Sequence, residues 1–275
     1  MVHCKFDVCG ILAVLITYSS LIYSDYCMIV YVLHPTIVEK SLWGTIHVVL
    51  YNTVIFILVY AHIKAVRSDP GRLPLPEVAV DFSETRRTSR KRKGKSVDEW
   101  TTCGRCEMFR PPRAHHCTTC RRCIKKMDHH CPWIYNCVGE RNVKCFLLYL
   151  FYVMVFSIYT VLLTAALFWR YTDEYTLEQI HERKIHVIVL LVMGLFFTLF
   201  SCWMMYDQLY CVFHDVTSIE LINPDFDREA HPPKSKMAYL TDVCGGGSKL
   251  KWFLPCATSM VTFDDGECGQ STLYV

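Results

Sequence analysis

Residues 145–169 read CFLLYLFYVMVFSIYTVLLTAALFW and contain no charged side chain. A helix needs about 20 mostly apolar residues to cross a hydrocarbon core roughly 30 Å thick, and this run is long enough. The alternative, a core helix of a soluble protein, is disfavoured because the run is apolar on every face and lacks a charged stripe. The stretch therefore predicts a membrane-spanning helix.

Three further apolar runs have the same length and character. The first is too long for a cleavable signal peptide and has no small-residue cleavage site, so we expect it to stay as an anchor. The pattern predicts an all-α polytopic membrane protein with four transmembrane helices. The expected spans are residues 8–33, 42–63, 145–169 and 185–210.

Basic residues are concentrated between the second and third spans. The stretch 64–144 holds 19 of the 29 lysines and arginines, against nine acidic residues. Since positively charged loops stay on the cytosolic side, we expect this central loop to be cytosolic, together with the N-terminus, 1–7, and the tail, 211–275. The short loops 34–41 and 170–184 are then lumenal.

The positive charge of the central loop could bind nucleic acid. Membrane lipids and an anionic cofactor are better partners for a loop tethered to a bilayer, so we expect no nucleic-acid partner.

The central loop changes composition near Trp100. Residues 64–102 form a basic linker, in which Ser68-Asp69-Pro70-Gly71 signals a turn. Its basic run at 86–93 is most simply a solvated or lipid-facing charge cluster, with a phosphorylation or localisation signal as the alternative. Residues 103–144 are instead rich in cysteine and histidine, and we expect them to form a separate cytosolic domain.

Seven cysteines and four histidines lie between residues 103 and 137. Glutathione keeps cytosolic thiols reduced, so metal binding explains these residues better than disulfides do. Zinc prefers four thiolate or imidazole ligands, and a Cys-x-x-Cys pair presents two of them from one tight turn. Cys103/Cys106 and Cys117/Cys120 are two such pairs. If one histidine and one further cysteine complete each pair, two Cys₃His sites result and three candidate residues remain.

The densest part of the stretch is Asp128-His129-His130-Cys131. A structural double-zinc domain needs no spare thiol, and a spare cysteine beside a spare histidine suggests chemistry. A cysteine attacks as its thiolate, which a histidine base can generate and a carboxylate can support. Asp128, His129 and Cys131 supply these three groups. Spacing alone leaves open whether His129 or His130 is the ligand, and it does not exclude Cys131 as a ligand.

The stretch 103–137, with its ligand spacing and the signature Asp128-His129-His130-Cys131-Pro132-Trp133, resembles the cysteine-rich domain of the DHHC family of protein S-acyltransferases. Asp69-Pro70-Gly71 matches the family's Asp-Pro-Gly motif, and Thr217-Ser218-Ile219-Glu220 is similar to its Thr-Thr-x-Glu motif. With the four spans, the likeness covers roughly residues 1–220. The chain departs from the family pattern at Ser218 and at 239–245, where it has Tyr239 and Cys244.

The resemblance implies a role for each residue of the cysteine-rich stretch. One zinc would be bound by Cys103, Cys106, His116 and Cys123, and the other by Cys117, Cys120, His130 and Cys137. Cys131 would carry the acyl group, with His129 as its general base and Asp128 as the orienting carboxylate, and His115 would be a bystander. Both zincs would be structural, since neither site leaves a position open for water.

The resemblance also implies the reaction. A fatty acyl-coenzyme A, typically palmitoyl, would acylate Cys131, and cytosolic membrane-proximal cysteines of substrate proteins would then accept the acyl group. We expect Arg121, Arg122, Lys125 and Lys126 to contact coenzyme A phosphates, and Trp133, Phe146, Tyr149 and Phe156 to line an acyl-chain cavity. For each of them a solvated charge or ordinary packing is the simpler alternative. Residues 6–10 and 100–145 look most like Golgi-type members, so we expect the Golgi membrane first and the endoplasmic reticulum second.

Functions from other classes make different demands on these residues. A non-catalytic zinc-containing membrane adaptor would need both zinc sites but not Asp128, His129 or a free Cys131. A zinc hydrolase is disfavoured because both predicted sites are closed. A metal transporter is disfavoured because the polar residues inside the four spans do not form a convincing path. We therefore expect an acyltransferase, with the adaptor as the main alternative.

Overall fold

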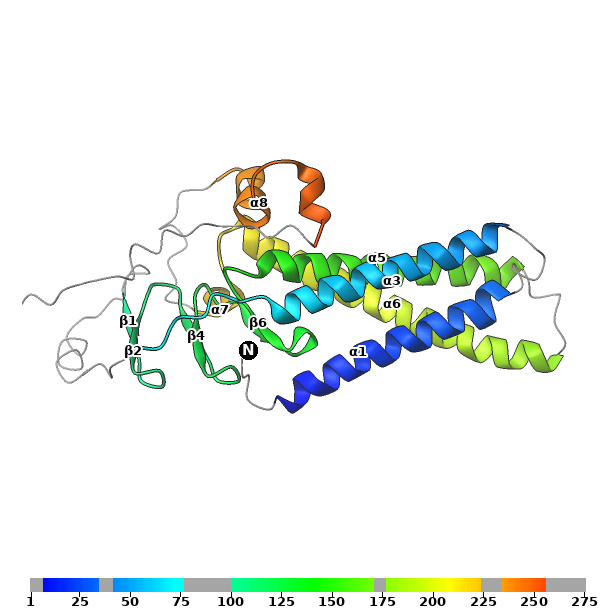
Figure 1. The fold of residues 1–275 in the computed structure, drawn as a ribbon, viewed down its shortest axis with the longest axis horizontal. Helices are drawn as coiled ribbons and strands as arrows, with labels where there is room; N and C mark the ends of the chain where they lie inside the picture. Colours follow the sequence, from blue (N-terminus) through cyan, green and yellow to red (C-terminus); the bar gives the residue numbers. More distant parts are fainter. Residues whose placement is uncertain (1–6, 35–41, 77–99, 171–176, 224–233, 256–275) are drawn as a thin grey trace, which may run out of the picture.

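The computed structural model describes residues 7–34, 42–76, 100–170, 177–223 and 234–255. Four long helices lie side by side as a bundle, and three small β-hairpins gather at one end of it (Figure 1). The basic run 86–93 of the linker lies outside the described residues. The arrangement therefore concerns the bundle, the cysteine-rich domain and part of the tail.

The four long helices are apolar over most of their length. α1 (Val8–Cys27) continues into a π-helical segment, η1 (Met28–Leu33). The other three are α3 (Leu42–Arg67), α5 (Val143–Arg170) and α6 (Leu177–Phe213). Each contains a stretch long and apolar enough to cross a membrane: Val8–Leu33, Leu42–Arg67, Val143–Leu167 and Arg183–Phe213. The predicted fold class, a polytopic helical membrane protein with a cysteine-rich double-metal domain, is confirmed.

Three helices extend beyond the expected spans, α5 by only two residues at its start and one at its end. α6 begins at Leu177, so the second half of the expected loop 170–184 is helical. Its residues LEQIHERK include good helix formers, but their charges lower the hydropathy by which a span is recognised. α3 ends at Arg67 rather than at residue 63, and Lys64 and Arg67 in its last turn interact favourably with the negative end of the helix dipole.

α5 is the central helix of the bundle and packs against both α3 and α6. Gly194 of α6 allows a close approach to α5, because a Cβ atom at this position would lie 2.6 Å from Cγ2 of Val161. Between α3 and α5, His47 Nδ1 lies 2.7 Å from Tyr159 Oη. His47 thus makes the interhelical hydrogen bond expected of a polar residue inside a span.

The cysteine-rich domain consists of three consecutive two-stranded antiparallel hairpins. Their turns are alike, since the equally spaced residues Glu107, Arg121 and Tyr135 all adopt a left-handed conformation, with φ of 50°, 52° and 49°. A single two-stranded hairpin is marginal in water, so each needs a further source of stability. The strands are β1 (Thr101–Cys103) with β2 (Met108–Arg110), β3 (His115–Cys117) with β4 (Arg122–Ile124), and β5 (His129–Cys131) with β6 (Asn136–Val138).

Asn136 joins the third hairpin to the bundle. Its buried side chain donates from Nδ2 to the carbonyl oxygens of Ala65, Val66 and Ser68, at 3.2, 3.2 and 2.8 Å. Carbonyls at the end of a helix lack partners within the helix, so this amide satisfies the last turn of α3. His62 adds a second contact, with Nε2 3.0 Å from the carbonyl oxygen of Trp133. The hairpin that carries Cys131 is therefore seated on the end of the bundle.

The described part of the tail returns to the bundle. It contains α7 (Ser218–Ile222), α8 (Lys236–Cys244) and a 3₁₀ turn, η5 (Lys249–Phe253). Lys144 Nζ donates to the carbonyl of Cys244 at the end of α8, at 2.9 Å, and Tyr152 Oη donates to the carbonyl of Phe253 at 2.6 Å. The tail segment that departs from the family pattern is thus held against α5.

Candidate active site and metal sites

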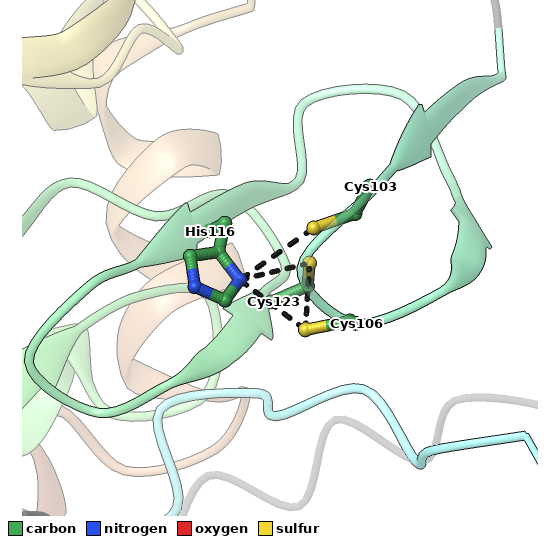
Figure 2. A group of neighbouring side chains, drawn as sticks. All are labelled: Cys103, Cys106, His116 and Cys123. Carbon is green, nitrogen blue, oxygen red and sulfur yellow. Dashed lines mark hydrogen bonds between the residues drawn. The ribbon is translucent and has the colours of Figure 1, made fainter.

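The first metal-binding group is drawn in Figure 2. Cys103, Cys106, His116 and Cys123 direct four ligand atoms into one space, all within 4.8 Å of one another. Cys103 and Cys106 come from the turn of the first hairpin, whereas His116 and Cys123 face each other across the second. His116 Nδ1 lies 3.2 Å from the Cys106 sulfur and 3.5 Å from that of Cys103. One hairpin's turn and the next hairpin's cross-strand pair thus build the site.

The second group repeats this arrangement one hairpin later. Cys117 and Cys120 lie at the turn of the second hairpin, and His130 and Cys137 face each other across the third. His130 Nδ1 lies 3.5 to 3.7 Å from the three sulfurs. Three thiolates and one imidazole are a tetrahedral zinc donor set with no open position. Both groups are therefore compatible with zinc, and His130 rather than His129 belongs to the second.

The repeat shows why Cys131 lies outside both groups. Cys103, Cys117 and Cys131 occupy the same position, at the end of the first strand of each hairpin. In the third hairpin, however, Ile134 stands where Cys106 and Cys120 stand in the other two. No Cys-x-x-Cys pair forms there, and the chain continues from the third hairpin into α5, so the Cys131 sulfur takes part in neither group.

Asp128 is held by donors from three parts of the chain. His129 Nδ1 lies 2.6 Å from Oδ2, and Gln208 Nε2 of α6 donates to the same oxygen at 2.9 Å. Ser218 donates its backbone N–H to Oδ1 at 2.6 Å and its hydroxyl to Oδ2 at 3.1 Å. Burial alone would raise the pKa of Asp128, but the hydrogen bonds from His129, Ser218 and Gln208 outweigh it and hold the pKa below its usual value.

His129 connects this carboxylate to Cys131. Burial would lower the pKa of its imidazole, but the hydrogen bond to Asp128 and the interaction with Cys131 raise it to about 9. Its Nε2 is buried and has no hydrogen-bond partner of ordinary length among the described residues. The ring edge packs against Phe146, with the two centroids 5.4 Å apart. The Asp128–His129 pair can therefore hold a proton on His129, next to the Cys131 sulfur.

An apolar cavity runs from Cys131 into the bundle and is lined by all four helices. The four expected wall residues, Trp133, Phe146, Tyr149 and Phe156, all line it. Phe146 and Phe156 lie on α5, and Cys131 itself is only 4% exposed. Sequence reasoning did not pick out Tyr18, His62 or Met204, which also line it, because a cavity wall cannot be told from a packed helix face by pattern alone.

The four basic residues expected at coenzyme A do not form one group. Lys125 pairs with Glu140 at 3.3 Å, and Lys126 pairs with Asp215 at 3.4 Å. Arg121 and Arg122 line a separate surface concavity with Arg105, beside the first metal group. None of the four is among the residues that line the apolar cavity.

Two contributors to the site were not found from the sequence. Gln208 lies in an apolar span, where an isolated amide gives no signal of its target. Arg113 lies in the loop before β3, and its guanidinium contacts both Asp215 and Glu220 after α6. A usable signal did exist at α7, since Thr217 and Glu220 form a capping box of the S/T-x-x-E type.

The chain is also similar in sequence to known proteins, and this similarity extends beyond the cysteine-rich domain. A sequence profile of the DHHC palmitoyltransferase family matches residues 96–225. The chain is 30% identical to Palmitoyltransferase ZDHHC3 of Homo sapiens over 256 residues, which cover 92% of this chain and 82% of that protein. It is 30% identical to Palmitoyltransferase ZDHHC7 of Rattus norvegicus over 257 residues, covering 90% and 79%. It is 33% identical to Probable protein S-acyltransferase 15 of Arabidopsis thaliana over 233 residues, covering 80% and 87%. Because the similarity runs through the spans as well as the cysteine-rich domain, the chain belongs to the DHHC palmitoyltransferase family and is a protein S-palmitoyltransferase.

Proposed function

We propose that Cys131 is the nucleophile that carries the acyl group between acyl-coenzyme A and the substrate protein. The observation that carries the proposal is its position. Cys131 lies outside both metal groups, beside the Asp128–His129 pair and at the wall of an apolar cavity. No other described cysteine combines these three features.

The chemistry is a double exchange of thioesters. Cys131 gives its proton to His129 Nε2, and the thiolate attacks the carbonyl carbon of the acyl-coenzyme A thioester. The carbon–sulfur bond to coenzyme A then breaks, and coenzyme A leaves as a thiol with the proton from His129. In the second half, a substrate cysteine gives its proton to His129 and takes the acyl group, and Cys131 recovers its proton.

Asp128 would orient His129 and stabilise its cationic form. The carboxylate holds Nδ1, which leaves Nε2 as the nitrogen that exchanges a proton with Cys131. Gln208 and Ser218 donate three further hydrogen bonds to Asp128 and so restrict rotation of the carboxylate. The expected roles of these three residues thus rest on the Asp128–His129 hydrogen bond and on the interaction of His129 with Cys131, rather than on adjacency in the sequence alone.

The cavity suits a long saturated acyl chain. From Phe146 to Thr160 its wall on α5 is about 21 Å long at 1.5 Å per residue, similar to an extended palmitoyl chain. Each methylene removed from water contributes about 0.8 kcal/mol to binding. We propose palmitoyl-coenzyme A as the donor, and cytosolic membrane-proximal cysteines of other proteins as acceptors.

Two zinc ions would hold the hairpins, bound by Cys103, Cys106, His116 and Cys123 and by Cys117, Cys120, His130 and Cys137. They supply rigidity and no reactive position, because both donor sets are complete without water. Lys125 and Lys126 remain our candidates for coenzyme A phosphate contacts. Arg121 and Arg122, which line the separate surface concavity, are further candidates. Binding there would require the two lysines to exchange Glu140 and Asp215 for phosphate.

The proposed topology places the N-terminus, the linker 64–102, the domain 103–144 and the tail 211–275 in the cytosol, where acyl-coenzyme A is available. The excess of basic residues in the central loop supports it. We propose the Golgi membrane as the location, with the endoplasmic reticulum second, on the likeness of residues 6–10 and 100–145 to Golgi-type members. Co-localisation of tagged full-length chain with markers of the two compartments tests this.

The decisive experiment compares wild type with Cys131→Ser in detergent. Palmitoyl-coenzyme A is added, and hydroxylamine-sensitive acyl incorporation and bound zinc are measured on the same samples. We expect Cys131→Ser to keep two zinc ions and to form no acyl-enzyme. Cys202→Ser, which changes an exposed cysteine of α6, is the matched control and should behave as wild type. Loss of zinc, or undiminished acylation, would show that Cys131 is a ligand or a bystander and would revive the adaptor alternative.

A further inference from the structure

The residue immediately before α1 touches the second metal group. Asp7 Oδ2 lies 3.0 Å from His130 Nε2, although the two residues are 123 positions apart. Both side chains are largely buried, with 12% and 16% of their surface exposed. The contact therefore joins the start of the first membrane span to the hairpin that carries Cys131.

The geometry gives this carboxylate a specific role. His130 directs Nδ1 toward the three sulfurs, so Nε2–H is its remaining donor and points at Asp7. A carboxylate on the outer nitrogen of a ligating histidine fixes the tautomer and ring orientation, and makes the ligand more basic. We propose that Asp7 is a positioning residue for His130 and thereby for the second metal group; this rests on that group being a zinc site, as proposed above.

Gly10 provides a second, independent observation. A Cβ atom at this position would collide with the Asp7 carboxylate and with the ring of Tyr135. Tyr135 ends the turn that follows Cys131 (η2, Pro132–Ile134), and α1 packs against this turn. The absence of a side chain at Gly10 thus lets the Asp7 carboxylate and the active-site turn meet at the same point on α1.

The local electrostatics favour a charged carboxylate here. Asp7 precedes the first turn of a 20-residue helix, where the positive end of the helix dipole stabilises negative charge. The first metal group differs, because no carboxylate among the described residues forms an ion pair with His116. Two sites with the same ligand types are therefore expected to respond differently to the loss of Asp7.

The test uses this difference as an internal control. Full-length Asp7→Ala in detergent is mixed with a zinc chelator and N-ethylmaleimide, and alkylation of each cysteine is followed by mass spectrometry. We expect Cys117, Cys120 and Cys137 to be alkylated about 10- to 100-fold faster than in wild type, as for the loss of a supporting contact at a metal ligand. Cys103, Cys106 and Cys123 should keep their wild-type rates. Asp7→Asn, whose amide oxygen can still accept from Nε2, should recover part of the protection.

Two further variants separate positioning from general destabilisation. Gly10→Ala should reproduce the pattern of Asp7→Ala, because its methyl group displaces the carboxylate. Asp242→Asn, which changes an exposed carboxylate paired with Lys234, should match wild type. Equal protection in wild type and Asp7→Ala would overturn the inference, as would equal acceleration at both metal groups. A wild-type chain without two bound zinc ions would instead contradict the proposed metal sites themselves.

Discussion

The guanidinium of Arg113 and the carboxylate of Glu220 form a bidentate ion pair, with Nε 2.7 Å from Oε1 and Nη2 2.9 Å from Oε2. Both side chains are buried, at 7% and 3% exposed. Glu220 also accepts the backbone N–H of Thr217, and the next residue, Ser218, donates to Asp128. Arg113 therefore holds α7 where Ser218 can hold the Asp128 carboxylate.

Arg113→Ala should destabilise the fold and reduce acylation. Removing one partner of a buried pair costs about 3–5 kcal/mol, because the remaining charge is left unpaired. Release of α7 would also loosen Ser218 from Asp128. Thermal unfolding and autoacylation with palmitoyl-coenzyme A measure the two effects.

The exposed pair Lys234–Asp242 serves as the control for Arg113. Its side chains are 55% exposed, and such surface pairs contribute about 0–1 kcal/mol. Lys234→Ala should therefore leave both the melting temperature and the autoacylation rate near wild type. An Arg113→Ala protein as stable and active as Lys234→Ala would contradict the role given to the Arg113–Glu220 pair.

Asp128→Asn should shift the pH dependence of autoacylation. The carboxylate raises the pKa of His129, which is about 9 in the folded protein against an ordinary histidine value of about 6.5. Without this charge the imidazolium is less stable, so the pKa of His129 falls toward its ordinary value. Because His129 must be neutral to accept the proton of Cys131, we expect the acidic limb of the pH–rate profile to move downward by about one unit or more, since one unit corresponds to about 1.36 kcal/mol.

The rate of Asp128→Asn at neutral pH should fall at least about tenfold, because loss of an orienting carboxylate costs up to about 10⁴ in related triads. Conversely, His129→Gln should abolish the acidic limb itself, since it removes the group that accepts the proton. An unshifted profile in Asp128→Asn would mean that the pair does not control the thiol.

Cys123→Ser should lower bound zinc from two ions per chain to one. Cys123 is a fully buried member of the first metal group and takes no part in the second. Since the small hairpins have little apolar core, loss of this site should also expose the first hairpin to protease. Metal analysis and limited proteolysis measure these effects. Cys211→Ser changes a buried cysteine outside both groups and should retain two zinc ions.

Phe156→Ala should shift the acyl-chain preference of the enzyme toward longer chains. Phe156 lines the cavity, and its ring packs against that of Tyr51, with the two ring centroids 5.2 Å apart. Space released there can bury additional methylenes, each worth up to about 0.8 kcal/mol, or about fourfold in selectivity. Competition between stearoyl- and palmitoyl-coenzyme A in autoacylation measures the change.

Phe151→Ala is a matched control on the same helix. Phe151 packs against Phe253 of the tail and does not line the cavity. It should leave the chain-length preference at the wild-type value. Since Phe→Ala in a core costs about 3–5 kcal/mol, Phe156→Leu offers a milder change that should move the preference in the same direction. No shift in either Phe156 variant would place the acyl chain elsewhere.

Much of this protein is visible in local sequence. A run such as 145–169 predicts a transmembrane helix because length and apolarity are properties of consecutive residues. The backbone hydrogen bonds of the helix also form between residues of the same run. The Cys-x-x-Cys pairs and the Asp128–Cys131 stretch are local as well, and the family likeness assigned their ligand sets. Local sequence predicts the ends of elements less well. The charged residues after Leu177 lower the hydropathy there, so the start of α6 was not predicted.

Other features depend on chain segments that meet only after folding. Asp7 with His130, Gln208 with Asp128, and Arg113 with Glu220 are separated by 123, 80 and 107 positions. No local pattern relates these partners, because hydrogen bonds between distant side chains depend on how helices and hairpins pack. The four spans, the metal-ligand types and the Asp128–Cys131 stretch follow from local sequence, because they depend on consecutive or closely spaced residues. The packing of distant segments establishes which carboxylates, amides and guanidinium groups hold that stretch in place.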